Sequence, residues 1–514
     1  MRRTIVSAFA AIAGGKMLVT LVMIVSIPLL VRLLGPDGYG MYATLMAIFA
    51  MLMILVSSGI NAGSRKYLSE DRDEPYWKSN VFGFYLRLAA VLALLGALAL
   101  LIGAELGVVS AALGDQFAPY FYLLAILTIA AQFRDYLRRS LMGLKLEHIS
   151  EPIHVGHKIV FAIVAIALVY LGFGVAGVLI GHIFASLVVA AVSLFFLSQH
   201  ISLTHSVRPT PPSFPRSQLL SFNHLAILYV FLLTSLYHVD VLMLEYFTTS
   251  ETVGYYKAAL VIVEFLWFVP RSIQSVMIQS TANLWLEDNV ERINSLASKT
   301  SRYTLLITIL LAIGLAALAS EFVPLYYGAE FTPSILPILL LLPGTIGFGL
   351  ARPIMAISMA KGDMKILIAA TGASATINFV LNLVLIPTYG MAGAAISTSI
   401  GYGSLPVFHV AGAHAMGYYP LSDLRATRIA ATTVLAGAVI GGLAMVITSP
   451  LLSLLIVPPV GGLVFATFAV LTGAVTLEEV VDLLCQLPAP LDRCGMALKT
   501  HVDGLQSAGS PTDD

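Results

Sequence analysis

Charged side chains are scarce in this 514-residue chain: Asp, Glu, Lys and Arg make up 11% of it, against 58% hydrophobic residues. A soluble protein carries about 25% charged residues, so the composition excludes a soluble fold. The 28 basic and 28 acidic side chains cancel, so no nucleic-acid partner is expected. The only two cysteines, Cys485 and Cys494, have no His or Cys at ligand spacing, and neither a disulfide framework nor a zinc site is indicated.

Long polar segments and catalytic motifs are also missing. The stretches between apolar runs are too short for a separate domain, which usually takes at least about 50 residues. Gly15-Lys16 lacks the earlier glycine of a phosphate-binding loop, so an ATP-driven pump is not indicated. Asp71-x-Asp73 resembles the metal-binding motif of glycosyltransferases, but it lies among mixed charges and is more simply a solvated loop. We therefore predict no enzyme activity, no catalytic residue, no metal and no cofactor.

The chain is instead rich in apolar runs. Fourteen runs of about twenty residues are each long enough to cross a bilayer as a helix. The first follows Met1-Arg2-Arg3 and is too long for a signal peptide, so a membrane helix is expected there. The runs lie near 8–31, 41–61, 81–102, 118–132, 155–171, 176–198, 222–245, 254–272, 303–320, 335–358, 366–386, 391–415, 427–447 and 452–474.

The basic residues between these runs predict an orientation. If the N-terminus is cytoplasmic, nearly all loop Lys and Arg fall on the cytoplasmic side, and the opposite loops contain only Arg32. This is the positive-inside pattern. It predicts a multi-pass protein of the plasma membrane with both termini in the cytoplasm. The short outer loops and few cysteines fit a prokaryotic cell.

Weak internal matches indicate a duplication. Each pairs residues 214 or 216 positions apart, in the same order along both halves. The pairs are Gly40 with Gly254, Gly114 with Gly328, Arg138 with Arg352, and Gly174-Val175-Ala176-Gly177 with Gly390-Met391-Ala392-Gly393. Because six runs precede the middle loop, both copies start on the same side and are parallel repeats.

The repeats predict an all-α polytopic membrane fold with two pseudo-symmetric bundles. Its domains are an N-terminal six-helix bundle (1–198), a cytoplasmic connector (199–220), a C-terminal six-helix bundle (221–415), two additional helices (427–474) and a cytoplasmic tail (475–514). The Pro- and Ser-rich composition of the connector favours a linker, and the tail is predicted to be disordered.

Six cationic side chains fall within or at the ends of the runs: Lys16, Arg87, Lys158, Lys257, Arg271 and Arg352. A charge near the bilayer centre costs about 2.5–3.5 kcal/mol on insertion scales, so such residues normally face a cavity or a partner. A cationic cavity would suit a phosphate or pyrophosphate head group, for which Arg offers forked donors and Lys a point charge. Lys16 and Arg87 are the strongest candidates.

The other cations have a second interpretation. Lys158, Arg271 and Arg352 can extend to the cytoplasmic interface, and Lys257 can pair with Glu264 or with an acid in an outer loop. We keep Lys257, Arg271 and Arg352 with Lys16 and Arg87 as candidate substrate-binding residues.

Two acids and two amides complete the candidate residues. Asp240 and Glu264 could couple transport to a cation or proton, or form structural ion pairs. Asn378 and Asn382 lie four residues apart on one helix face, a spacing typical of interhelical hydrogen bonds. His238, close to Asp240, is the most notable of the scattered histidines.

Several motifs together resemble a known family. They are Arg32-Leu33-Leu34-Gly35-Pro36-Asp37-Gly38-Tyr39-Gly40-Met41-Tyr42, Asp240 with Val253-Gly254-Tyr255-Tyr256, Tyr326-Tyr327-Gly328-x-x-Phe331, Ala375-x-x-Asn378-x-x-x-Asn382-Leu383-x-Leu385-Ile386-Pro387 and Tyr389-Gly390-x-x-Gly393-Ala394-Ala395. The sequence resembles the Wzx-type polysaccharide transporters, or lipid-linked oligosaccharide flippases, of the multidrug/oligosaccharidyl-lipid/polysaccharide exporter (MOP) superfamily. The motifs extend over most of the chain, and the hairpin around Pro387 is the most specific.

The resemblance implies fold and function. It implies two six-helix bundles that meet in a V around a central cavity, with fourteen helices in some members. It also implies alternating access, in which a polyprenyl (pyro)phosphate-linked glycan passes from the cytoplasmic to the outer leaflet while its lipid tail stays in the bilayer. Glycan assembly enzymes would be possible partners. No single residue is fixed in this family for head-group binding, so the site assignment rests on the cations alone.

Two other functions stay open. A cation-coupled multidrug antiporter of the same superfamily would need acids in the first bundle, where the deep groups are Lys16 and Arg87. A membrane-embedded glycosyltransferase or polymerase would need acids on a sizeable outer loop, and the outer loops are short.

Overall fold

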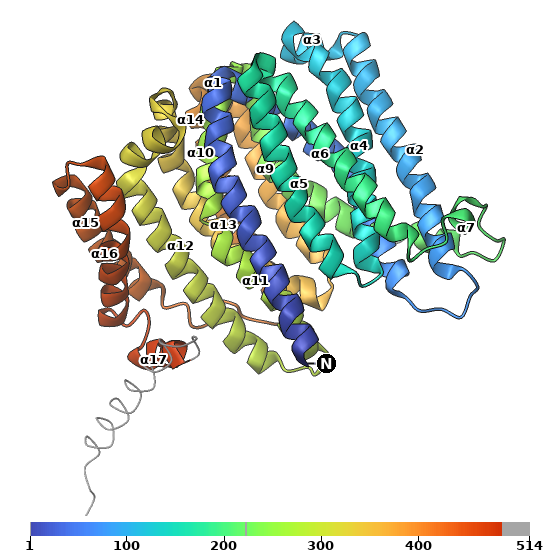
Figure 1. The fold of residues 1–514 in the computed structure, drawn as a ribbon. Helices are drawn as coiled ribbons and strands as arrows, with labels where there is room; N and C mark the ends of the chain where they lie inside the picture. Colours follow the sequence, from blue (N-terminus) through green and yellow to red (C-terminus); the bar gives the residue numbers. More distant parts are fainter. Residues whose placement is uncertain (1, 221–223, 486–514) are drawn as a thin grey trace, which may run out of the picture.

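The computed structural model describes the backbone of residues 2–220 and 224–485 and the side chains of residues 18–220, 224–482 and 485. Within this part of the chain, every regular element is a helix (Figure 1). The first helices are α1 (Arg2–Ser69), α2 (Trp77–Glu105), α3 (Val108–Leu113), α4 (Ala118–Gly143), α5 (Glu147–Leu168) and α6 (Gly174–Ser198). Next come α7 (Leu203–Val207), α8 (Arg216–Leu220), α9 (His224–Phe247), α10 (Ser250–Phe265), α11 (Phe268–Leu286), α12 (Val290–Tyr327), α13 (Ile335–Lys361) and α14 (Met364–Ala415). The last are α15 (Ala426–Val446), α16 (Pro450–Leu471) and α17 (Leu477–Cys485), and short helices η1 (Asp115–Phe117), η2 (Val169–Phe173) and η3 (Ala329–Ser334) join some of them.

The described helices form a multi-pass membrane protein. Ten are long and apolar enough to cross a membrane, or eleven if α10 and α11, bent by 52° at their junction, count as one span. The sequence predicted fourteen runs because three of these helices, Leu18–Ser69, Glu147–Ser198 and Met364–Ala415, each have 52 residues and contain two runs. A straight helix of that length would be about 78 Å long, more than twice the ~30 Å hydrocarbon core.

Each of these three helices is broken at a glycine. Gly35, Gly174 and Gly390 have φ values of 67°, 50° and 54°, a conformation that only glycine adopts without strain. The chain reverses there, so that residues 22–30 of α1 lie beside residues 39–47. Likewise, Gly401 packs against Asn378 within α14.

Glycines that the duplication pairs share one backbone conformation. Gly174 has φ 50° and ψ −134°, and Gly390 has φ 54° and ψ −131°. Gly114 has φ 101° and ψ 156°, and Gly328 has φ 106° and ψ 159°. Each member of this second pair precedes a short 3₁₀ helix, η1 or η3. The weak sequence matches therefore fall on positions with matching local geometry.

The helices pack in two groups that α1 joins. In the first group, α4 contacts α2, α5 and α6, and α5 also contacts α6; α9 to α14 form the second group. α1 contacts α4 and α5 of the first group and α9 and α10 of the second, and it runs along the front of the molecule in Figure 1. α15 and α16 pack on each other and on α12, at the edge of the second group.

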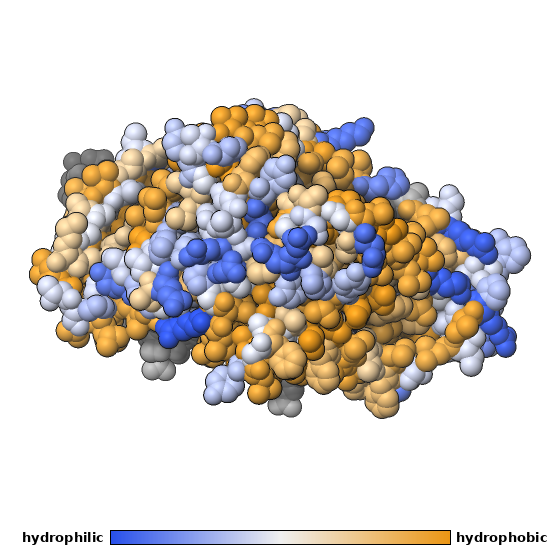
Figure 2. Space-filling view, turned by 90° about the horizontal axis from the view of Figure 1, so that it is seen from above, coloured by the Kyte–Doolittle hydropathy of each residue, from blue (hydrophilic) through white to orange (hydrophobic). Residues whose placement is uncertain are grey.

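The two groups meet closely where α1 reverses. Gly40 and Gly254 lie against each other's helices, and a Cβ on Gly254 would lie 1.9 Å from the carbonyl oxygen of Pro36. The Arg32 guanidinium donates hydrogen bonds to the carbonyls of Leu325 and Tyr326. Seen from this end, hydrophilic residues form a band across the centre and hydrophobic residues surround it (Figure 2). The contact closes this end of the molecule.

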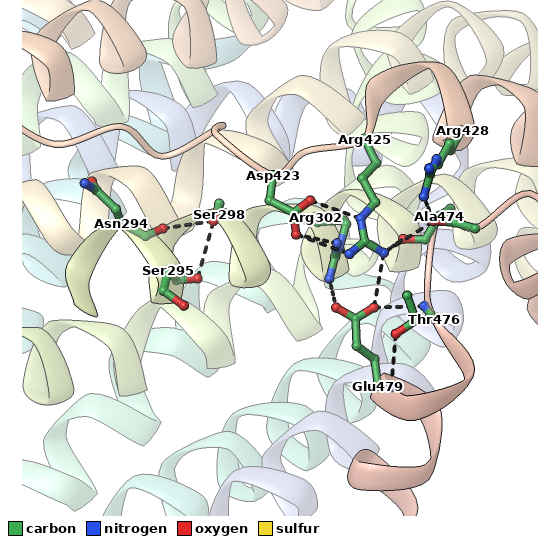
Figure 3. A network of polar contacts seen from close by, with 11 residues as sticks. Asn294, Ser295, Ser298, Arg302, Asp423, Arg425, Arg428, Ala474, Thr476 and Glu479 are labelled. Atoms are coloured by element: carbon green, nitrogen blue, oxygen red, sulfur yellow. Dashed lines mark hydrogen bonds and ion pairs between the residues drawn. The ribbon is translucent and has the colours of Figure 1, made fainter. Parts of the chain in front are cut away.

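An ion-pair network joins α12 to the C-terminal helices (Figure 3). The Arg302 side chain is fully buried and pairs with Asp423, at 2.7 Å, and with Glu479 of α17. Arg425 contacts both acids, at 3.0 and 3.4 Å. Burial would raise the pKa of Glu479, but the Thr476 backbone N–H and the charges of Arg302 and Arg425 outweigh it and lower that pKa below its usual range.

This network corrects one prediction. The tail from residue 475 was predicted to be disordered, but residues 477–485 form α17, because Glu479 pairs with the two arginines and Val481 is buried. The remainder of that prediction, residues 486–514, lies outside the described residues.

Candidate functional site

A cavity of about 310 Å³ lies between the two helix groups and has a cationic lining. Lys158 of α5 and His182 of α6 come from the first group, and His238 of α9 and Lys257 of α10 come from the second. The first half of α1 forms an apolar wall, which includes Met23. Among the described residues that line this central cavity, none is acidic.

In the first helix group, two contacts hold the imidazole ring of His182 in place. The His182 Nε2 lies 3.0 Å from the Tyr42 hydroxyl, and the ring stacks on Phe161 with centroids 3.9 Å apart. Lys158 and Lys257 are half-buried, and within the described part of the chain no hydrogen bond or ion pair engages either ammonium group. An ammonium group without a protein partner in a membrane cavity is suited to bind an anion.

A second cavity, of about 330 Å³, adjoins the first, since Met23 lines both. Its polar lining is mixed and includes Glu151 and His154 of α5. Across from them, Glu264 and Arg271 also line it and form an ion pair of 3.4 Å. Pairing of Glu264 with Lys257 was one of two alternatives for that lysine, and in the structure the acid pairs with Arg271.

Arg352 lies inside the second helix group and does not line either cavity. Its side chain is 5% exposed and donates to Gln274 Oε1 at 3.0 Å and to the Tyr237 hydroxyl at 2.9 Å. The guanidinium also lies over the rings of Phe348 and Trp267, at 4.5 and 5.1 Å from their centroids. These contacts position the charge within the protein rather than toward a substrate.

The two cations favoured from the sequence do not contribute described contacts to the central cavity. Arg87 is exposed on α2, where its Nη1 donates to the carbonyls of Ser206 and Arg208, both at 3.2 Å. It lines a separate pocket at the edge of the first helix group. Lys16 lies on α1, but its side chain is outside the described residues.

Asp240, Asn378 and Asn382, which the sequence singled out separately, belong to one buried network. Asp240 accepts hydrogen bonds from the Tyr256 hydroxyl and, at 3.0 Å, from Thr398 Oγ1. Asn378 Nδ2 donates to Thr398 Oγ1, and Asn382 Nδ2 donates to Asn378 Oδ1, both at 3.2 Å. The Oδ1 of Asn382 is buried and has no partner within the described chain. A cluster of oxygens around one carboxylate can hold a small cation or a proton.

Sequence reasoning missed several members of these sites. It placed Lys158 at the interface and treated His182 as unremarkable, and it did not identify Tyr42, Tyr256 or Thr398. The reversal at Gly390 brings Thr398 to Asn378 and Asp240. The reversal at Gly35 brings Tyr42 to the cavity wall. The glycine motifs were the available signal, but they do not show which side chains meet.

Two apolar grooves flank the first half of α1. One, of about 720 Å³, is lined by Ile24, Phe265, Leu318 and Val457 among others, so it lies between α1, α10, α12 and α16. Phe265 also lines the second cavity, so this groove adjoins it. The other groove, of about 850 Å³, lies between α1 and α5.

A family model described as "Polysaccharide biosynthesis protein" matches residues 29–336, more than half of the chain. The chain belongs to the polysaccharide biosynthesis protein family. A "Probable low-salt glycan biosynthesis flippase Agl15" of Haloferax volcanii is 25% identical over 237 residues, which is 45% of this chain and 49% of the relative. An "Uncharacterized membrane protein MJ1068" of Methanocaldococcus jannaschii is 26% identical over 181 residues, or 34% of each chain. The matched region thus spans about half of one relative and a third of the other.

Solved structures place this family member in the MOP fold, as the motifs predicted. A "Lipid II flippase MurJ, inward closed conformation" has a TM-score of 0.70 at 14% identity and covers 90% of this chain and 98% of its own. An inward-facing multidrug resistance MATE family transporter of the MOP superfamily has a TM-score of 0.66 at 16% identity and covers 82% and 99%. The likeness shows that this chain has the fold of these two proteins.

Proposed function

We propose that this protein is a flippase that moves a polyprenyl (pyro)phosphate-linked oligosaccharide from the cytoplasmic to the outer leaflet. The observation that carries the proposal is the central cavity, where Lys158 and Lys257 approach from opposite helix groups. Its anionic ligand would be the phosphate head group, since the lining contains two lysines and two histidines and no described acid. The family assignment and the partial match to a probable glycan flippase support the same substrate class.

The sizes of the cavities suit a substrate whose head group, sugars and lipid tail bind in different places. About 310 Å³ accommodates a phosphate or pyrophosphate group but not a whole oligosaccharide. The sugars nearest the phosphate would enter the adjoining second cavity, whose lining of Glu151, His154, Glu264 and Arg271 offers both donors and acceptors. The polyprenyl tail would leave through the apolar groove at Phe265 and remain in contact with lipid.

Alternating access would use the two helix groups as its moving parts. We propose that they are two pseudo-symmetric six-helix bundles, with α15 and α16 as additional helices, in fourteen crossings and with both termini in the cytoplasm. The paired glycine conformations support the pseudo-symmetry. In the present state, the contact at Gly40 and Gly254 closes the end that the charge pattern assigns to the outside.

The experiment that tests the substrate is lipid analysis of a strain that lacks this protein. We expect a completed lipid-linked oligosaccharide to accumulate and surface glycan to be lost. The wild-type gene should restore both, whereas Lys158→Ala/Lys257→Ala should not. The exposed Lys299→Ala is the matched control and should restore both.

Each alternative function has a different result. Unfinished lipid-linked intermediates would favour a glycosyltransferase or polymerase. Unchanged lipids in drug-sensitive cells would favour the antiporter and refute the flippase.

A further inference from the structure

A pocket on the outer flank of α2 is separate from the substrate cavities. It has a volume of about 500 Å³ and lies between α2 and the connector that joins the two helix groups. Arg87 and Leu88 of α2 line one side, and Arg216 and Leu220 of α8 line the other. α2 and α7 lie at the edge of the molecule, where the surrounding membrane can reach them (Figure 1).

The two arginines keep donors for a ligand. Arg87 uses only Nη1 in hydrogen bonds to the protein, and Arg216 uses Nε and Nη2 on Thr210. Within the described chain, neither guanidinium has a carboxylate within 4.0 Å, and none of the residues that line the pocket is acidic. Two arginines that share a pocket without an acid favour an anion, for which the guanidinium is the best side-chain donor.

An apolar stripe extends along α2 from Arg87. The exposed side chains on it are Val91, Leu94, Leu95, Leu98 and Ile102. Their spacing of three and four residues places them on one helix face. From Arg87 to Ile102 the helix rises about 22 Å, more than half of the ~30 Å hydrocarbon core. The stripe is therefore long enough to cover a lipid chain of one leaflet.

We propose that this pocket binds an anionic membrane phospholipid of the leaflet on the connector side. The phosphate group lies between Arg87 and Arg216, and an acyl or isoprenoid chain lies along the stripe that begins at Val91. A free phosphate would satisfy the arginines but would leave the stripe unused. A zwitterionic lipid would place its own cation beside two arginines.

The bound lipid supports the connector. Gly83 allows α7 to approach α2 so closely that a Cβ on Gly83 would lie 1.9 Å from the Ser206 carbonyl oxygen. The Arg87 bonds to Ser206 and Arg208 hold the same segment. A lipid on Arg87 and Arg216 therefore joins the connector to α2 from the membrane side. This inference does not rest on the proposed substrate.

Native mass spectrometry of the full-length protein in detergent tests the site. Phosphatidylglycerol and phosphatidylcholine are titrated separately, and inorganic phosphate is added as a competitor. We expect Arg87→Ala/Arg216→Ala to weaken one phosphatidylglycerol adduct by roughly 30-fold, since each arginine near an anionic surface contributes about fivefold. Phosphatidylcholine binding should not change, and millimolar phosphate should not displace the lipid.

Two control variants separate the lipid site from other effects. Tyr85→Phe removes a hydrogen bond to the Leu219 carbonyl, 3.1 Å long, and so loosens the connector without loss of charge. Arg292→Ala removes an exposed arginine elsewhere. Both should keep the adduct. An unchanged adduct in the double arginine variant, equal affinity for phosphatidylcholine, or equal loss in Tyr85→Phe would overturn the proposal.

Discussion

Cationic side chains within the helices occur in three different surroundings, and these decide what each can do. Arg352 is satisfied by Gln274, Tyr237 and two aromatic rings, and Arg271 has Glu264. Lys158 and Lys257 line a cavity without a described partner. A charge near the centre of the membrane costs about 2.5–3.5 kcal/mol. For the two arginines, contacts within the protein offset this cost. For the two lysines no such contact is described, so under the proposed function a bound anion would offset it.

The buried carboxylate of Asp240 is the candidate for energy coupling. If it holds the coupling cation or proton, Asp240→Asn and Thr398→Val should remove the dependence of transport on an imposed sodium or proton gradient and slow it at least about tenfold. Ser397→Ala is the matched control, because that neighbouring hydroxyl bonds only to the Gly393 carbonyl, at 2.8 Å. Transport into proteoliposomes with either gradient measures the effect. A gradient dependence that survives in both variants would exclude coupling at this network.

The lowered pKa of Glu479 predicts that the stability of the folded protein depends on pH. Its pKa is lower in the folded protein than the usual ~4.3, so its contribution is fully present above that value and is lost as pH falls through the folded pKa. Glu479→Gln should cost about 1–3 kcal/mol at neutral pH, because buried Arg302 loses a charged partner. Thermal melts of the purified protein between pH 3 and 7 measure this. The variant should melt at a lower temperature than wild type at pH 7, and the gap should narrow below about pH 4.5.

The exposed Glu291 provides the control for this prediction, since it lies on α12 away from the network. Glu291→Gln should melt as wild type does. A gap between wild type and Glu479→Gln that stays constant down to pH 3 would show that the charge of Glu479 does not stabilise α17.

The residues of the site were only partly predictable. Asp240, Asn378 and Asn382 stood out because polar groups are rare in apolar runs, and this is a local property. That Thr398 and Tyr256 join them depends on a reversal at Gly390 and on the packing of α10, neither of which spacing reveals. Arg87 stood out by the same rule, but it contacts the connector. The position of a residue within an apolar run does not show whether its side chain faces a cavity or the lipid.

At the scale of elements, the reversals at Gly35, Gly174 and Gly390 decide which helix segments lie side by side. Gly390→Ala should destabilise the protein by about 1–3 kcal/mol, because alanine is strained at φ 54° and ψ −131°. Steric overlap does not contribute, since a Cβ there would meet its nearest atom, Cγ2 of Thr248, only at 4.0 Å. Gly174→Ala should cost the same if the duplication is real. Melting temperatures of purified variants measure both.

A glycine inside a helix provides the comparison. Gly441 lies within α15, and a Cβ there would meet nothing within 4 Å. Gly441→Ala should leave stability unchanged or raise it by up to about 1 kcal/mol through helix propensity. If Gly390→Ala behaved like Gly441→Ala, the reversal would not require glycine.

The elements themselves were largely predictable, because apolar runs and turn glycines are local signals. Within the described residues that were searched, from Leu18 on, the apolar runs fall on the ten candidate spans and on the bent pair α10 and α11, and the paired glycines have matching conformations. The break between α10 and α11 was not predicted, since residues 254–272 form one apolar run although the chain bends by 52°. α17 was missed because its stability comes from Arg302, 177 residues earlier in the chain.

At the scale of the whole molecule, the contact at one end and the cavities between the groups describe one conformation of the fold that this chain shares with the MurJ and MATE structures. The contact that closes this end has no room for side chains at Gly40 and Gly254, so the two groups touch there through their backbones. Lys158 and Lys257 belong to different groups, and their mutual repulsion opposes closure around an empty cavity. Under the proposed function, an anionic head group would offset that repulsion and would so link movement of the groups to the presence of substrate.

The number of crossings determines on which sides of the membrane the termini lie. Fourteen crossings place both ends on one side, whereas eleven would place them on opposite sides. A membrane-impermeant thiol reagent should therefore label Cys485 and Cys494 in inverted vesicles and not in intact cells, and Cys485→Ser/Cys494→Ser should abolish the signal. A protease site added before Met1 should be cleaved from the same side. Cleavage of the N-terminus from outside, with thiols that react only from inside, would require an odd number of crossings. That result would refute the parallel repeat. Two six-helix copies followed by two more helices can only return the chain to the side on which it began.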